Sequence, residues 1–360
     1  MVLQIRMLRL DSVKGRTAVW PLCCNEQVDR SLLSLNGVLE QADGRLQAGS
    51  HAAARVWSTG FRVLDKYLGG GFRSGELILL SGSQGLGKTT WALQVARNIA
   101  RAGRSVVFFS FEHDPQTLLI RLVSMEAGEI GGVEAPGLDR IRASFEASDG
   151  RTGSITDRLR DTECGARAIQ AVEEYADRLV LHRSTGSSTT LEVIRDAVEQ
   201  VRRDTSQLPL VVVDYLQKVK ALDAIDSQVD RITTVVEGLK DLALDIDIPV
   251  LAVVAADKTV VGAGKRVRVG DLRGSSALGS EADAVLTLNN KYDVVARHHL
   301  MYNLGAAERF REWAVLTIEK NRNGKDGVDL EFAKRFEQGR FESSGQRVSE
   351  QLVDERIFVE

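Results

Sequence analysis

The 360-residue sequence has few cysteines and no long apolar run. Its three cysteines are Cys23, Cys24 and Cys164, and this spacing gives neither a disulfide framework nor the CxxC pattern of a zinc site. No stretch of about 18 uncharged apolar residues is present, as a membrane helix would need. Residues 1–16 also lack the basic-then-apolar order of a signal peptide. We therefore expect reduced thiols, no structural zinc, no membrane association and a cytoplasmic location.

An excess of positive charge is lacking as well. The formal net charge is −3 at pH 7, which excludes a generally basic protein that coats nucleic acid. Any contact with a polyanion must then be local. With 43% hydrophobic and 27% charged residues, the chain is long enough for one large core and some appendages.

From Arg55 onward, apolar runs alternate with amphipathic segments, which is typical of a parallel sheet covered by helices. Several runs are uninterrupted, as expected for strands that are buried on both faces. The sequence therefore predicts an α/β fold with a mostly parallel, twisted sheet flanked by helices. Residues 1–54 are expected to form an N-terminal extension with a helix around 26–46, and residues 125–175 to form short helices and loops. The predicted strands are 76–82, 104–111, 178–182, 208–214, 248–254, 283–288, 314–320 and 329–336.

A glycine-rich segment follows the first of these strands and fits the pattern GxxxxGK[ST]. Its glycines allow consecutive backbone N–H groups to point at phosphate oxygens, and the helix that follows adds the partial positive charge of its N-terminus. Lys88 is expected to reach the β- and γ-phosphates, and Thr89 to bind Mg²⁺. The alternative is a glycine-rich turn without a ligand. The predicted nucleotide-binding residues are Gly82, Ser83, Gln84, Gly85, Leu86, Gly87, Lys88, Thr89 and Thr90.

Two acidic residues stand at the ends of predicted strands. Asp214 ends the run LPLVVVD, where a carboxylate can hold Mg²⁺ beside the phosphates. Glu112 follows the run RSVVFFSF, where a carboxylate can orient the attacking water or accept its proton. Each could instead be an ordinary solvated acid at a strand end.

With these residues placed, residues 55–341 resemble the C-terminal ATPase domain of the DnaB-type replicative helicases, a branch of the RecA-like P-loop fold. The similarity lies in an ordered set of segments and not in the phosphate loop alone. Residues 342–360 remain as a C-terminal tail, which we expect to dock on a neighbouring subunit. The segments are TGFRVLDKYLGGGFRSGELILLSG, FFSFEHDPQTLLIRL, VVVDYLQ, VVEGLKDLALDIDIPVLAVV, DLRGSSALGSEADAVL and AVLTIEKNRNG.

The resemblance implies ATP and Mg²⁺ as cofactors, a homo-oligomeric ring, in this family a hexamer, and single-stranded DNA as a partner. Lys320 and Arg322 match the basic pair that reaches the neighbouring subunit's γ-phosphate, although such a pair is usually a solvated strand end. Residues 256–276 match a loop that lines the central pore and follows DNA phosphates; the alternative is a surface loop that binds nothing. The cations expected to contact DNA are Lys258, Lys265, Arg266, Arg268 and Arg273.

The sequence departs from the family pattern at two places. Val254 and Ala255 stand where the family usually carries Ser-Gln, and residues 275–280 differ from the usual SGxIEQ. Both changes bear on the coupling of hydrolysis to DNA movement. We therefore keep two hypotheses: a DNA helicase that works with loading or other replication or recombination proteins, or a RecA-like ATPase of the RadA or KaiC kind whose cycle drives assembly without unwinding. A kinase or transferase is disfavoured because no acceptor-binding module is visible.

Overall fold

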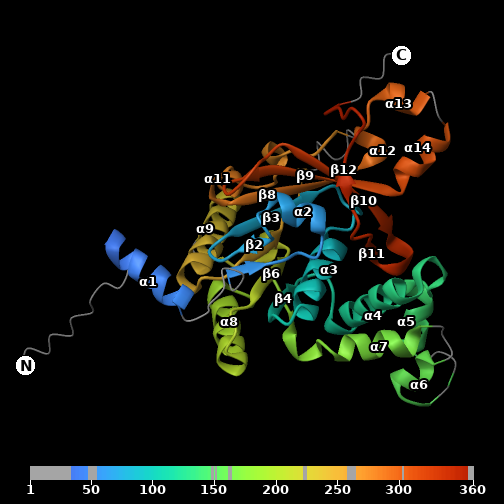
Figure 1. Ribbon diagram of the computed structural model, residues 1–360, viewed down its shortest axis with the longest axis horizontal. Coiled ribbons are helices and arrows are strands. Elements are labelled where there is room, and N and C mark those ends of the chain that lie inside the picture. The colour runs from blue at the N-terminus through green and yellow to red at the C-terminus, as the bar shows by residue number, and fades with distance from the viewer. Residues whose placement is uncertain are drawn as a thin grey trace, which may run out of the picture. The chain divides into compact units, whose positions relative to one another are not determined.

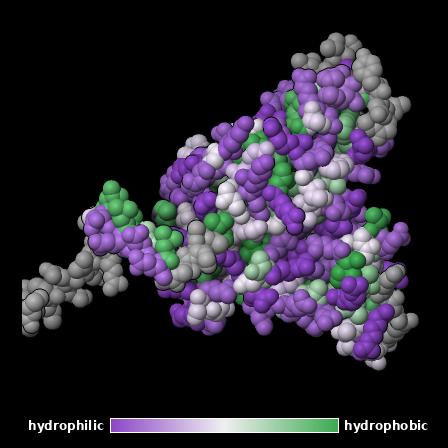
Figure 2. All heavy atoms as spheres, viewed as in Figure 1, coloured by the Kyte–Doolittle hydropathy of each residue, from purple (hydrophilic) through white to green (hydrophobic). Residues whose placement is uncertain are grey.

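The computed structural model of the chain describes residues 34–47, 55–146, 150, 152–160, 164–221, 225–257, 265–301 and 304–355. By its internal contacts the chain divides into two units, residues 1–51 and 52–360. In the first unit, the described residues form helix α1 (Leu35–Gln47), which confirms the predicted helix from residue 35 onward; residues 26–33 of that prediction lie outside the described part. The side chains of Leu35, Leu39 and Leu46 are exposed and give this helix an apolar surface (Figure 2).

The second unit is built around a sheet, whose described strands run in the order β11-β10-β9-β8-β3-β7-β6-β4-β5, with β12 paired to β10. All eight predicted strands are confirmed. A separate pair, β1 (Val56–Trp57) and β2 (Phe72–Arg73), lies outside this sheet. The strands of the main sheet are β3 (Leu77–Gly82), β4 (Val106–Ser110), β5 (Leu179–Arg183), β6 (Leu210–Asp214), β7 (Val250–Val253), β8 (Ala284–Asn290), β9 (Trp313–Asn321), β10 (Val328–Arg335), β11 (Arg340–Phe341) and β12 (Gln346–Arg347).

The six strands from β8 to β5 are mutually parallel, whereas β9 to β12 add antiparallel strands at one side. Successive residues of a strand point to opposite faces. In β6, Leu210 and Val212 belong to one hydrophobic core, and Val211 and Val213 belong to the other. Both faces are therefore buried, as the uninterrupted apolar run predicted.

Helices cover the sheet on both faces (Figure 1). Helices α3, α4 and α7 contribute to the first core, and α8 and α9 contribute to the second. The expectation for residues 125–175 is confirmed, except that the long helix α4 continues to Gly131. None of the described helices is long and apolar enough to cross a lipid bilayer. The helices of the second unit are α2 (Arg62–Tyr67), α3 (Lys88–Arg101), α4 (Pro115–Gly131), α5 (Leu138–Glu146), α6 (Ile155–Leu159), α7 (Gly165–Glu173), α8 (Leu191–Thr205), α9 (Gln228–Ile246), α11 (Ala277–Glu281), α12 (Lys291–Val294), α13 (Arg297–Met301) and α14 (Leu304–Arg311).

The C-terminal segment docks on its own chain. The Ala296 N–H donates to the Gln351 carbonyl at 2.8 Å, and the Val353 N–H donates to the Val294 carbonyl at 2.7 Å. Lys291, only 4% exposed, forms an ion pair with Glu350 at 2.8 Å. The described part of the tail thus contacts its own subunit, and its expected docking on a neighbouring subunit stays a prediction.

A buried ion pair joins α3, the helix that follows the phosphate loop, to α4. Arg97 Nε lies 2.7 Å from Glu126 Oε1, and both side chains are 1% exposed. Arg97 also pairs with Glu129 at 2.6 Å. Removing one partner of a buried pair leaves an uncompensated charge, which costs more than an exposed pair contributes.

We expect Glu126→Gln to lower the free energy of unfolding by about 2 kcal/mol, because Arg97 then loses its fully buried carboxylate and keeps only Glu129. Equilibrium urea unfolding measures this change. Asp139→Asn removes one partner of the exposed pair with Arg142 and should leave stability nearly unchanged. Equal effects of the two substitutions would contradict the assignment of Glu126 as a stabilising residue.

Candidate nucleotide-binding site

The phosphate loop lies between the end of β3 and the start of α3. Gly82 has φ of +150° and Gly87 has φ of +78°, which side chains rarely permit. A Cβ on Gly82 would lie 2.4 Å from the Leu288 carbonyl oxygen, and one on Gly87 would lie 2.8 Å from the Phe336 ring. Both backbone conformation and space therefore require glycine at these two positions.

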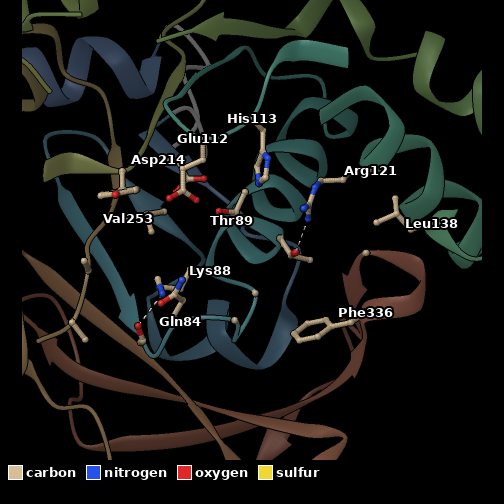
Figure 3. Close-up of a pocket in the computed structure, with 18 of the residues that line it drawn as sticks. Gln84, Lys88, Thr89, Glu112, His113, Arg121, Leu138, Asp214, Val253 and Phe336 are labelled. Carbon is tan, nitrogen blue, oxygen red and sulfur yellow. Dashed lines mark hydrogen bonds between the residues drawn. The ribbon is translucent and has the colours of Figure 1, made fainter. Parts of the chain in front are cut away.

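Lys88 extends along the phosphate loop at the base of a cavity (Figure 3). Its ammonium group donates to the carbonyl oxygens of Gly82 and Ser83, each at 2.9 Å. Burial lowers the pKa of Lys88, whereas the charges of Asp214 and Glu112 act in the opposite direction. The lysine thus lies at the place where the sequence predicted it, with its charge close to the cavity.

Asp214 and Thr89 lie together at the carboxyl end of the sheet. Asp214 is 1% exposed, and its side chain forms a hydrogen bond with the Thr89 side chain. Burial raises the pKa of Asp214 to about 6, and the charge of Glu112 adds to this effect. Asp214 Oδ2 has no hydrogen-bond partner in the described part of the chain. A buried carboxylate oxygen without a partner, next to a hydroxyl group, fits the ligands of a divalent cation.

Glu112 follows β4 and lines the same cavity, with its carboxylate directed toward Asp214 and Thr89 (Figure 3). Unlike Asp214 it is exposed to solvent. The parallel strands β3, β4 and β6 end at this edge, which explains why three segments far apart in sequence meet here. The structure thus brings together the predicted lysine, threonine and two acids.

The cavity has a volume of about 680 Å³, within the range of small-molecule sites. Beyond the phosphate loop it extends to Leu138 and Phe336, which offer an apolar wall. It also contains Arg121, which the sequence motifs did not indicate. The sequence did contain a signal for this residue. A spacing of three and four residues places Arg121 on the same face of α4 as the buried Leu118 and Met125, so its charge faces the protein interior.

Gln217 contacts Ala255, the residue that stands where the family usually carries a glutamine. Its side-chain oxygen accepts from the Ala255 N–H at 3.2 Å, and its amide donates to the Arg273 carbonyl at 3.1 Å. Val254 is fully buried, whereas Ala255 lines the cavity. Gln217, which follows β6, therefore links Ala255 after β7 to the loop that contains Arg273.

Lys320 and Arg322 lie at the end of β9 and do not line the cavity of the phosphate loop. Lys320 donates to the Gly279 carbonyl at 2.8 Å, and Arg322 forms an ion pair with Asp283 at 3.2 Å. Lys320 instead lines a second cavity, together with Glu319 and with residues such as Val269 and Ser275. Their action on a neighbouring subunit stays a prediction, since a single chain contains no such contact.

The predicted DNA-binding cations have different surroundings. Arg266 is 5% exposed and pairs with Asp329, so its guanidinium is not accessible to a DNA phosphate, and the prediction for this residue is wrong. Lys265 pairs with Glu355 at 2.9 Å, and Arg268 pairs with Glu319 at 3.0 Å. Arg268 also contacts Asp354 of the C-terminal segment. Arg273 is exposed and lines the nucleotide cavity. Lys258 lies outside the described residues.

A phosphate loop at a strand-to-helix junction, a strand-end aspartate and a nearby glutamate, all at the carboxyl edge of a parallel sheet, define a RecA-like P-loop nucleotide-binding domain. The profile described as DnaB-like helicase C terminal domain matches residues 57–343. The chain belongs to this family.

Individual relatives agree with the family match. The chain is 28% identical to the replicative DNA helicase DnaB of Rickettsia bellii over 273 residues, which cover 71% of this chain and 49% of that protein. It is 26% identical to the DnaB of Haemophilus influenzae over 305 residues, which cover 84% and 58%. The chain thus spans about half to three fifths of the length of these relatives.

Two solved structures share the fold. One is described as an ATPase domain and superposes with a TM-score of 0.65 at 21% identity, covering 86% of this chain and 98% of that one. The other is a DnaB-like replicative helicase, described with its interactions with primase, and gives a TM-score of 0.66 at 21% identity, covering 86% and 68%. The expected RecA-like architecture is confirmed.

Proposed function

We propose that this chain is the motor part of a ring-forming, ATP-hydrolysing DNA helicase that moves on single-stranded DNA. The observation that carries the proposal is the meeting of Lys88, Thr89, Glu112 and Asp214 in one nucleotide-sized cavity of a DnaB-family domain. The family match favours this function over the RadA- or KaiC-like alternative. The cytoplasmic location is part of the proposal, because DNA is the substrate.

In this mechanism Lys88 leaves the loop carbonyls and binds the β- and γ-phosphates of ATP. Thr89 and Asp214 would hold Mg²⁺, which neutralises charge on these phosphates when bound. Glu112 orients a water molecule and accepts its proton as the water oxygen attacks the γ-phosphorus, while the bond to the βγ-bridging oxygen breaks.

Lys320 and Arg322 complete the site of the neighbouring subunit in this proposal. Their charges would approach the γ-phosphate across the subunit boundary, where they stabilise negative charge in the transition state. Hydrolysis then depends on assembly into a ring, which we infer to be a hexamer. The apolar surface of α1 would pack on another copy, and loading or other replication proteins would act on the assembled ring.

DNA contact is proposed for Lys265, Arg268 and Arg273, together with Lys258. Two of these cations pair with carboxylates of the C-terminal segment, Asp354 and Glu355. DNA phosphates must therefore compete with these carboxylates. Binding of this kind follows the backbone, is insensitive to base sequence and weakens as salt rises.

Unwinding of a forked duplex by the purified protein with ATP tests the function. We expect strand separation, and hydrolysis that single-stranded DNA stimulates. Robust hydrolysis with neither strand separation nor stimulation would contradict the helicase proposal and favour the assembly-driving alternative.

Two double substitutions test the proposed DNA-binding cations: one removes two of these cations, and the other removes the two carboxylates that pair with them. Lys265→Gln with Arg268→Gln should weaken oligo(dT) binding and lower the salt slope by about 1.4, since each lost phosphate contact on a single strand removes about 0.7. Asp354→Asn with Glu355→Gln should strengthen binding by freeing the same cations. Arg202→Gln with Arg203→Gln, on exposed positions of α8, is the control with equal charge change. Unchanged affinity in the first two variants would show that this surface does not bind DNA.

A further inference from the structure

Arg121 lines the nucleotide cavity and forms no ion pair with a carboxylate of the described residues. It projects from α4 between His113 and Leu138, with its guanidinium directed into the cavity (Figure 3). Its Nη1 donates a long hydrogen bond to Thr90 Oγ1, at 3.5 Å. Its Nε is buried and has no hydrogen-bond partner in the described part of the chain. Arg121 is therefore a cation whose hydrogen-bonding capacity is largely unused.

Three other arginines that face the protein interior have carboxylate partners. Arg97, Arg266 and Arg340 are buried, and each pairs with at least one carboxylate. Around Arg121 the described carboxylates form no such pair. Burial lowers the pKa of Arg121 and the charge of Arg142 adds to this, whereas the charge of Asp214 acts in the opposite direction. Partial burial of a charge that lacks a carboxylate in direct contact costs free energy. An anion that enters the cavity would remove this cost, and the planar fork of a guanidinium matches the oxygens of a phosphate.

The position of Arg121 along the cavity selects one phosphate. Thr89 and Asp214 mark the metal end, where the β- and γ-phosphates are expected. Leu138 and Phe336 form the apolar end, which suits a nucleoside. Arg121 contacts Thr90, one residue beyond the metal-binding threonine, and so lies between these two ends.

We propose that Arg121 binds the α-phosphate of the nucleotide, and so recognises nucleoside diphosphates and triphosphates alike. The inference rests on the proposed nucleotide site and adds a residue to it. It predicts that Arg121 contributes to ground-state binding of substrate and product equally, and not to recognition of the γ-phosphate.

The test is the equilibrium affinity of the full chain for ATP and for ADP, each with Mg²⁺. Arg121→Gln should weaken both by the same factor, about 10- to 100-fold, as expected for the loss of charge-assisted hydrogen bonds to a phosphate. Arg121→Lys should recover part of the affinity, because it keeps the charge and loses the fork. Arg140→Gln is the control, since Arg140 lies on α5, is exposed and does not line the cavity. Its affinities should not change.

The outcomes separate this inference from the proposed function. Weaker binding of ATP alone would assign Arg121 to the γ-phosphate, and unchanged binding of both nucleotides would remove it from the site; either result overturns the proposal. Urea unfolding without nucleotide tests whether Arg121 has a merely structural role instead. We expect Arg121→Gln to be at least as stable as the wild type. A clear loss of stability would contradict the proposal. If the wild-type chain bound neither nucleotide, the proposed function itself would fail.

Discussion

Substitution of Lys88 by alanine is expected to reduce ATP hydrolysis by at least about 100-fold, the effect typical of removing one well-placed charge or donor from a transition state. The reason is geometric. Lys88 stands at the start of α3, and its ammonium group already lies against the phosphate loop, at Gly82 and Ser83. No other lysine of the described chain lines the cavity.

Steady-state hydrolysis at saturating ATP measures this effect, and affinity for ATP and ADP accompanies it. Because the lysine serves the β- and γ-phosphates, Lys88→Ala should weaken ATP more than ADP. Lys66→Ala, at an exposed position of α2, is the matched control and should behave as the wild type. Hydrolysis within a few-fold of the wild type in Lys88→Ala would place catalysis elsewhere.

The second large effect is expected from replacing both Lys320 and Arg322 by alanine. Hydrolysis should fall by about 1,000-fold or more, the range typical of an arginine that a partner protein inserts into a phosphoryl-transfer site. Nucleotide affinity should change much less than turnover, because the pair is proposed to stabilise negative charge that develops in the transition state. This separation of binding from turnover identifies residues that act in the transition state.

Stability must be measured alongside, since Lys320 also donates to the Gly279 carbonyl and Arg322 pairs with Asp283. Asp283 keeps its ion pair with Lys240 at 2.7 Å in the double variant, so we expect the fold to persist. Lys325→Ala, in the exposed turn after β9, is the control. A double variant that folds, assembles and hydrolyses ATP normally would contradict the role of the pair.

The strands and the phosphate loop could be predicted from the sequence because their signals are local. A run such as LPLVVVD is apolar at nearly every position, and the glycines of the loop are required by its backbone. The meeting of Asp214, Glu112 and Lys88 could also be predicted, because parallel strands end at one edge of the sheet.

The pairing of individual cations could not be predicted in the same way. Arg266 looked like part of a DNA-binding loop, but Asp329, 63 residues further on, pairs with it inside the protein. Arg268 contacts Asp354, 86 residues away, through a tail whose place no local pattern indicates. Sequence gives the charge of a residue, whereas its partner depends on the tertiary fold.

In the proposed ring, each γ-phosphate is held between Lys88 of one subunit and the Lys320 and Arg322 pair of its neighbour. The most direct measurement mixes the Lys88→Ala protein with the Lys320→Ala, Arg322→Ala protein and follows ATP hydrolysis after exchange of subunits. Each protein alone should be inactive. In a randomly mixed ring at equal amounts, about a quarter of the interfaces would combine an intact loop with an intact basic pair, so activity should return toward that fraction of the wild type. A mixture in which subunits exchange but hydrolysis stays at the sum of its two inactive parts would contradict the claim.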